Sequence, residues 1–265
     1  MNLQEQLNRI QEMMTKIANE DFTDYGDLSN PDKLKSDFDK YISSDEPRGV
    51  GKIHQSIGNN LGEIIEILKQ DFGFKSIKYV GEGYYGMAFD VGKNKIIKLT
   101  NNKDEIDGIE YVLEKQKELG GSVPGVVHYY NLKYYPTSNV YAILMDKVKP
   151  LSKKEETIYT VIYYEMANHS DSDFWDKYDD SNEDIREEFI EFLIDRLESP
   201  RPEDELPSFK IDEYNLVNYI DTYRELLTTL ESNNVPTEDL HGGNIGRKDN
   251  KLIHFDVMDF PENKL

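Results

Sequence analysis

The most informative part of this sequence is the stretch Ser232-Asn-Asn-Val-Pro-Thr-Glu-Asp239-Leu-His241-Gly-Gly-Asn244-Ile-Gly246. Asp239 precedes Asn244 by five positions, and Asp256 follows Asn244 by twelve, at the end of an apolar run over 252–255. Carboxylate and amide oxygens are hard ligands of the kind that Mg²⁺ binds, and two of them meeting at a phosphate-bound ion suit phosphoryl transfer. Each piece alone also fits an Asx-rich loop with a plain Gly-Gly turn, but the ordered set is hard to produce by chance.

A second motif, Gly81-Glu82-Gly83-Tyr84-Tyr85-Gly86, has the spacing G-x-G-x-x-G. In a dinucleotide-binding unit the third glycine opens a helix, whereas here an alternating, strand-like sequence follows. A glycine-rich hairpin lets backbone N–H groups approach phosphate oxygens, because no Cβ blocks them. The motif therefore predicts a phosphate-binding hairpin, although such matches are often ordinary turns.

Lys98 ends the next strand-like run, Ile96-Ile97-Lys98. A lysine on an apolar strand is costly to bury unless it meets an anion. Standing alone, it would be read as a strand-end lysine that reaches into water.

The periodicity predicts an α+β chain in which a small antiparallel sheet precedes a mostly helical part. Helices are expected over 1–20, 59–70 and 104–119, the last ended by Gly120, then from a capping box at Ser152 and Glu155, and through 185–193 and 211–230. Strands are expected near 77–79, 87–91, 96–99, 126–130, 140–145, 244–246 and 252–257.

Composition excludes several classes of function. The 265 residues carry 31 Lys plus Arg against 52 Asp plus Glu, a net charge of −21, which disfavours nucleic acid and anionic lipid as partners. No apolar run is long enough to span a membrane, and no signal-peptide pattern opens the chain. The sequence has no cysteine, so disulfides and thiolate sites are excluded and a cytoplasmic location is expected.

Taken together, these motifs resemble the protein-kinase-like superfamily over roughly residues 72–260. The resemblance implies a bilobal fold with an N-terminal helical extension (1–71), an N-lobe built on a small antiparallel sheet with one main helix (72–148), and a truncated, mostly helical C-lobe with the catalytic loop (149–265). It also implies ATP and Mg²⁺ as cofactors.

Residue by residue, the resemblance assigns the nucleotide site to the first part of the chain. Lys98 would grip the α- and β-phosphates, held by Glu105 or, since the gap is short, by Glu110. The other assignments are the phosphate-binding glycines, the gatekeeper and the two hinge backbones that meet adenine: Gly81, Gly83, Gly86, Met145, Asp146 and Val148.

The same resemblance assigns the chemistry to the second part. Asp239 would orient or deprotonate the attacking hydroxyl, while Asn244 and Asp256 would hold Mg²⁺, with Asp259 as the competing second ligand. His241 stands where protein kinases usually carry Lys, which gives D-L-H-x-x-N as in aminoglycoside- and choline-kinase-like enzymes.

Departures from the protein-kinase pattern are also clear. Thr237-Glu238 replaces His-Arg, Val257-Met258 replaces Phe-Gly, and only nine residues follow Asp256, which leaves no room for an activation segment. These features are similar to compact kinase-like proteins of phages and large DNA viruses, which would place the chain in a host cytoplasm.

The sequence therefore predicts an ATP-dependent phosphotransferase acting on protein Ser/Thr hydroxyls, with a small-molecule hydroxyl as the alternative acceptor. A third hypothesis is a pseudokinase or acidic interaction protein. Residues 168–206 carry 15 acidic against 4 basic residues, usually a solvated surface but also a candidate docking site for a basic partner. Nucleotidyl transfer stays open as a different phosphate chemistry.

Overall fold

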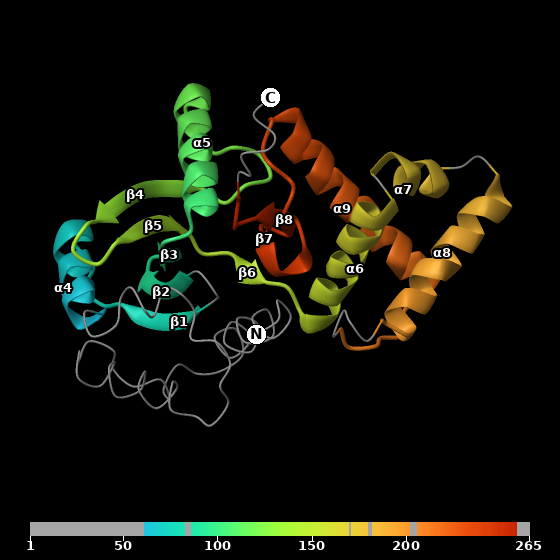
Figure 1. Cartoon of the computed structure of the whole chain (residues 1–265), viewed down its shortest axis with the longest axis horizontal. Coiled ribbons are helices and arrows are strands. Elements are labelled where there is room, and N and C mark those ends of the chain that lie inside the picture. Colours follow the sequence, from blue (N-terminus) through green and yellow to red (C-terminus); the bar gives the residue numbers. More distant parts are fainter. Residues whose placement is uncertain (1–60, 83–85, 170, 180–181, 202–205, 259–265) are drawn as a thin grey trace. The chain divides into compact units, whose positions relative to one another are not determined.

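A computed structural model describes residues 61–82, 86–169, 171–179, 182–201 and 206–258 (Figure 1). The helix predicted over 1–20, Gly83 and Asp259 lie outside the described residues. The chain forms two compact units. The first contains the described residues up to Val123, then Val127–Val148 and Met258, and the second contains Pro124–Val126 and Lys149–Val257.

The first unit is built on a five-stranded antiparallel sheet with the order β1-β2-β3-β5-β4. Its strands are β1 (Lys78–Glu82), β2 (Gly86–Gly92), β3 (Lys95–Thr100), β4 (Tyr129–Tyr135) and β5 (Val140–Asp146). Lys93 and Asn94 have φ of 54° and 57° in the β2–β3 turn, which is the left-handed backbone that a tight hairpin needs.

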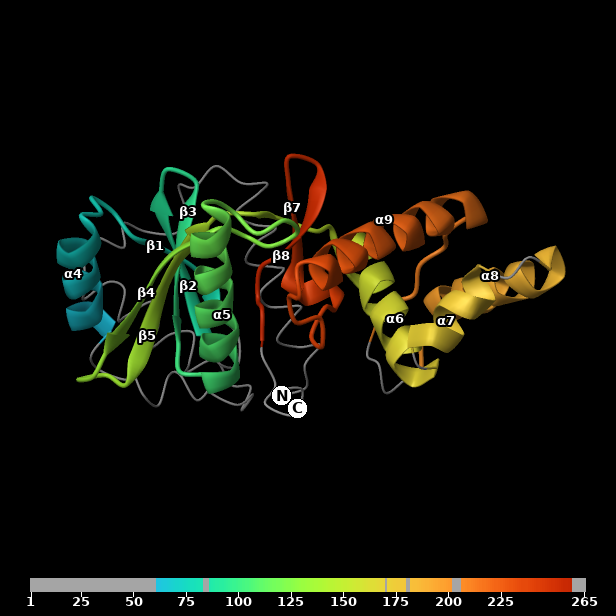
Figure 2. The same ribbon diagram turned by 90° about the horizontal axis from the view of Figure 1, so that it is seen from above.

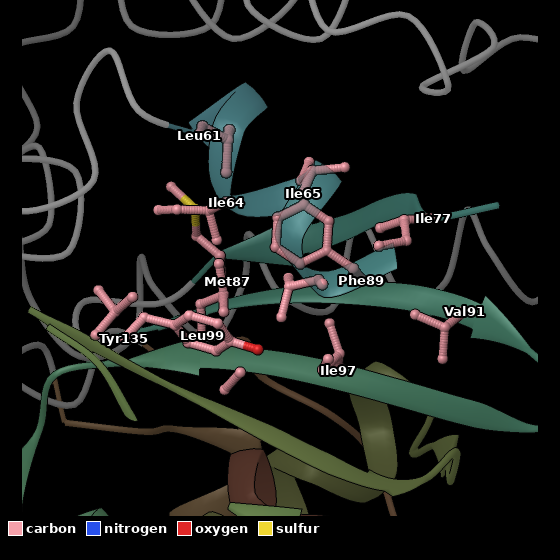
Figure 3. Packing of buried hydrophobic residues seen from close by; sticks show 13 residues of the cluster. Leu61, Ile64, Ile65, Ile77, Met87, Phe89, Val91, Ile97, Leu99 and Tyr135 are labelled. Carbon is pink, nitrogen blue, oxygen red and sulfur yellow. The ribbon is translucent and has the colours of Figure 1, made fainter. Parts of the chain in front are cut away.

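Two helices, α4 (Leu61–Phe72) and α5 (Lys103–Leu119), flank this sheet (Figure 2). Side chains alternate between the faces of a strand, so Ile97 and Leu99 enter the core under α4 while Lys98 points to the other face. Figure 3 shows the core itself. In this core, four residues of α4 (Leu61, Ile64, Ile65 and Leu68) pack against residues of the sheet and its flank. The other members of the cluster are Ile77, Met87, Phe89, Val91, Ile97, Leu99, Tyr135, Val140 and Ala142.

The second unit is mainly helical. It contains α6 (Lys153–His169), α7 (Asp171–Tyr178), α8 (Glu183–Glu198), α9 (Glu213–Ser232), the short 3-10 helix η3 (Gly242–Asn244), and a small sheet of β6 (Lys149–Pro150), β7 (Ile245–Lys248) and β8 (Lys251–His254). Gly125 packs against α9, where a Cβ would meet Leu230 at 3.1 Å. Its carbonyl accepts the N–H of His254 at 2.8 Å, which joins residues 124–126 to this unit.

Most of the predicted elements are confirmed, including the α+β class and the antiparallel sheet. Helix α5 ends at Gly120 with φ 64°, and the capping box of α6 forms with Ser152 N–H donating to Glu155 Oε2 at 2.9 Å. The strand predicted over 126–130 starts too early and ends too early, because β4 spans Tyr129–Tyr135 and Val126 makes an isolated bridge to His254. Among the described residues, no helix combines the length and apolarity that crossing a membrane would need.

Candidate active site

The first cluster of candidate residues is an ion pair in the sheet unit. Lys98 Nζ lies 2.7 Å from Glu105 Oε1, and the glutamate side chain is only 1% exposed while that of the lysine is 17% exposed. Glu110 is exposed. Of the two predicted partners, the structure therefore pairs Lys98 with Glu105.

Thr100 completes this pair from the end of β3. Its hydroxyl donates to Glu105 Oε2 at 2.8 Å, so both carboxylate oxygens of the buried glutamate have a partner. The same hydroxyl oxygen accepts the N–H of Asn102 at 3.1 Å. Sequence reasoning missed Thr100, since a threonine at a strand end carries no motif.

The glycine motif forms part of the β1–β2 connection. Gly81 lies in β1 and Gly86 in β2, whereas Gly83 is outside the described residues. A Cβ at Gly86 would lie 2.7 Å from Lys98 Cε and 3.0 Å from the carbonyl oxygen of Leu99. The glycine therefore leaves room for the lysine side chain to pass.

The predicted gatekeeper Met145 and the predicted hinge residue Asp146 end β5, and the second hinge residue, Val148, follows two positions later. Met145 and Val148 are buried. Asp146 donates its N–H to the carbonyl of His128 at 3.0 Å, and its Oδ1 accepts the hydroxyl of Tyr130 at 2.8 Å. The contact of Asp146 and Val148 with adenine stays a prediction.

The second cluster lies in the helical unit, where η3 folds the loop back on itself. Asn244 Nδ2 donates to both the carbonyl of Asp239 at 2.9 Å and its Oδ2 at 2.7 Å. With its nitrogen committed to Asp239, the amide leaves Oδ1 as the atom available to a cation. The loop geometry thus ties the two residues that the sequence predicts to work together.

His241 lies beside Asp239 and is almost fully buried, with 3% of its side chain exposed. Burial lowers the pKa of His241 to about 4, and the negative charge of Asp256 opposes this only partly. Its Nδ1 accepts the N–H of Gly243 at 3.0 Å, so the neutral ring carries its proton on Nε2. Nε2 lies 3.5 Å from Asp239 Oδ1.

The hairpin of β7 and β8 brings Asp256 to the same loop. Ile245 pairs with His254, and Phe255 donates its N–H to the carbonyl of Asn244 at 3.0 Å. Asp256 is partly exposed, and its charge reaches both buried histidines. Burial lowers the pKa of His254 to about 4 as well, and the negative charge of Asp256 opposes this only partly.

Two helices hold the loop in place, through residues that the sequence did not single out. Tyr163 of α6 donates its hydroxyl to the carbonyl of Glu238, and Tyr223 of α9 donates to that of Leu240 at 3.0 Å. Gly242 packs directly on α6, where a Cβ would lie 2.1 Å from the carbonyl oxygen of Glu156. Gly242 is therefore required for close packing and is more than part of a turn.

Asn244 and Asp256 stay the residues predicted to hold Mg²⁺. Asn244 Oδ1 and the Asp256 carboxylate are hard donors, and the Asn244 side chain is oriented by Asp239. Among the described residues, no group of three or more His, Asp and Glu side chains is arranged for a metal. An ion bound here would take its remaining ligands from phosphate and water, as Mg²⁺ commonly does.

Comparison with known proteins gives fold-level matches only. No family model and no curated protein matches the chain. It is similar to a streptomycin-ATP complex of APH(2'')-IIa, with 14% identity over 74% of this chain and 72% of that one, at a TM-score of 0.28.

Two further solved structures show the same level of likeness. A thermostable mutant of the aminoglycoside phosphotransferase APH(4)-Ia has 12% identity, covers 73% and 70% of the two chains, and has a TM-score of 0.33. Choline kinase LicA from Streptococcus pneumoniae has 15% identity, coverage of 73% and 68%, and a TM-score of 0.30.

Proposed function

We propose that this protein is an ATP- and Mg²⁺-dependent phosphotransferase that acts on a hydroxyl group. The observation that carries the proposal is the pair of hydrogen bonds from Asn244 Nδ2 to Asp239. They fix a carboxylate that can accept a proton next to an amide oxygen that can bind a cation. Asp256, joined to the same loop through Phe255, supplies a second oxygen ligand.

Each cluster has a distinct role in this proposal. Lys98, held by Glu105, would bind nucleotide phosphates, and the glycines at 81 and 86 would let backbone N–H groups approach them. Asp239 would orient the attacking hydroxyl and accept its proton. When bound by Asn244 and Asp256, Mg²⁺ would neutralise the charge that develops on the phosphates.

Protein Ser/Thr hydroxyls are our first candidate acceptor, on the basis of the protein-kinase-like glycine motif and hinge sequence. A small-molecule hydroxyl is the second candidate, and His241 favours it. Buried and neutral beside Asp239, this ring cannot supply the positive charge of the lysine that protein kinases carry at its position. Labelled ATP offered with either a protein lysate or a metabolite pool separates the two acceptors by which fraction takes up phosphate.

The assignment is tested by replacing Asp239→Asn and following phosphate transfer, with mass spectrometry of the protein and its acceptor as the readout. We expect transfer to fall by about a thousandfold or more while thermal unfolding stays close to wild type. Asp249→Asn is the matched control, since Asp249 is exposed in the β7–β8 turn and has φ 51°, a conformation that Asn also tolerates.

Undiminished transfer in Asp239→Asn would overturn the proposed role of that carboxylate. If Mg²⁺-ATP produces no thermal shift in the wild type, the pseudokinase reading is favoured instead. An added nucleotide in place of a phosphate on the acceptor would show nucleotidyl transfer.

A further inference from the structure

We propose that Thr100 is a positioning residue for Lys98, because its hydroxyl frees Glu105 from a helix-capping role and commits it to the lysine. The proposal rests on the proposed function only in assigning Lys98 to nucleotide phosphates. The contacts themselves belong to one unit and to one short stretch of chain, between the end of β3 and the first turn of α5.

The position of Glu105 in α5 is the starting point. Asn102 is the N-cap, and its Oδ1 accepts the N–H of Asp104 at 3.2 Å, so Glu105 is the third residue of the helix. At that position a glutamate commonly turns back and accepts the N–H of the N-cap residue, which forms a capping box. Glu105 instead binds Lys98 at 2.7 Å.

Thr100 explains this departure. Its Oγ1 accepts the Asn102 N–H at 3.1 Å, which is the bond that the glutamate of a capping box would otherwise make. The same hydroxyl then donates its proton to Glu105 Oε2 at 2.8 Å. One hydroxyl therefore satisfies the helix start and holds the carboxylate in the direction of Lys98.

Removing the hydroxyl restores a competition for Glu105. The Asn102 N–H then becomes a target for the carboxylate, so the glutamate divides its time between helix capping and Lys98. Thr100 is fully buried, and Val has nearly the same shape, so Thr100→Val changes the hydrogen bonding with little change in packing volume. Thr100→Ser keeps the hydroxyl and loses only a methyl group.

The first test measures the chemical reactivity of the Lys98 amine with sulfo-NHS-acetate, read out as the acetylation rate of the peptide containing Lys98. In the wild type the amine is engaged by Glu105, so acetylation is expected to be slow. We expect Thr100→Val to raise the rate about fivefold and Thr100→Ser to return it to the wild-type value. Ser138→Ala, which removes another buried hydroxyl from the same unit, should leave the rate unchanged.

The second test compares two ligands by calorimetry, Mg²⁺ with a non-hydrolysable ATP analogue and adenosine alone. We expect Thr100→Val to weaken binding of the triphosphate about tenfold and to leave adenosine affinity unchanged, since Lys98 would touch only phosphates. A purely structural effect would weaken both ligands together.

The outcomes separate the two proposals. An acetylation rate in Thr100→Val equal to wild type overturns the role of Thr100, whether or not nucleotide binds. A wild-type protein that binds no nucleotide overturns the proposed function, and the acetylation rates still decide the role of Thr100. If Thr100→Val does not fold, Thr100→Ala is measured against Thr100→Ser in the same way, and equal rates in that pair overturn the proposal.

Discussion

At Gly86 the absence of a side chain shapes the surroundings of Lys98. A Cβ there would lie 2.7 Å from Lys98 Cε and 3.0 Å from the carbonyl oxygen of Leu99, so the flexible lysine has to move and the strand has to shift by a few tenths of an ångström. We expect Gly86→Ala to fold but to displace Lys98 from Glu105 and weaken Mg²⁺-ATP binding about tenfold. Calorimetric titration with Mg²⁺-ATP measures this effect.

Gly121→Ala serves as the control for this substitution, since a Cβ at that position meets nothing within 4 Å. It should bind Mg²⁺-ATP as the wild type does. Equal affinity in Gly86→Ala would show that the lysine accommodates the methyl group without leaving the nucleotide phosphates.

Single residues also show where reading the sequence reaches its limit. Lys98 was predicted because the resemblance to kinase-like proteins assigns a phosphate-binding lysine to that strand, and Glu105 was one of two candidates, with Glu110, for its partner. Thr100, Tyr163 and Tyr223 act through hydrogen bonds to backbone groups or to another side chain, and such bonds depend on the folded geometry. No residue type or spacing in the sequence indicates such hydrogen bonds.

At the scale of elements, α6 and α8 are joined by a buried ion pair. Arg196 Nε donates to Glu165 Oε1 at 2.8 Å, and the side chains are 8% and 0% exposed. Without Arg196 the buried carboxylate keeps only the partly exposed Arg201, whose Nη2 lies 3.6 Å from Glu165 Oε1, and breaking a buried pair costs about 3–5 kcal/mol. We expect Arg196→Met to lower the free energy of unfolding by about 3 kcal/mol, measured by urea denaturation.

Two further variants bracket this prediction. Arg224→Met removes an ion pair with Asp179 that is 38% and 48% exposed, and should cost less than about 1 kcal/mol. The double variant Arg196→Met, Glu165→Leu should recover part of the loss, because neither charge then remains in the interior. A single Arg196→Met variant as stable as the wild type would contradict the assignment of a buried pair.

Elements with a clear period were the ones predicted well. Helix α5 has both a capping asparagine and a terminating glycine, and its predicted range differs from the observed one by a single residue. Strand β4 lies at the edge of the sheet, and most of its side chains between Tyr129 and Tyr135 are exposed or half-buried, so its sequence lacks an apolar alternation. The apolar Val126 and Val127 just before it are buried without joining that strand, and they drew the prediction there.

At the scale of the whole molecule, the net charge is −21, and one buried acid, Glu156, has a strongly raised pKa. Burial raises the pKa of Glu156 from 4.5 to about 8, since little nearby positive charge compensates it. The unfolded chain ionises this group above pH 4.5 while the folded protein keeps it protonated up to about pH 8. Its contribution to stability is therefore present at low pH and is lost as pH rises through that window.

Glu156→Gln tests this linkage, because the amide does not titrate. Between pH 5 and 8 the wild type should lose on the order of 1 kcal/mol more per pH unit than the variant, as judged from urea denaturation at several pH values. Comparing slopes removes the common effect of the other acidic groups. Identical slopes for the two proteins would show that Glu156 is ionised in the folded state at neutral pH.

The short segment Pro124–Val126 has a consequence for how the chain can be divided. It leaves the sheet unit after α5, gives a backbone carbonyl to His254, and returns to the sheet unit at Val127. The polypeptide thus crosses between the two units four times, after Val123, Val126, Val148 and Val257. If the gene is divided at codon 149, the C-terminal product lacks the stretch that bonds to His254 and packs on α9. The N-terminal product carries that stretch without the residues on which it packs. Producing the two units as independent polypeptides would therefore require grafting residues 124–126 onto the C-terminal product.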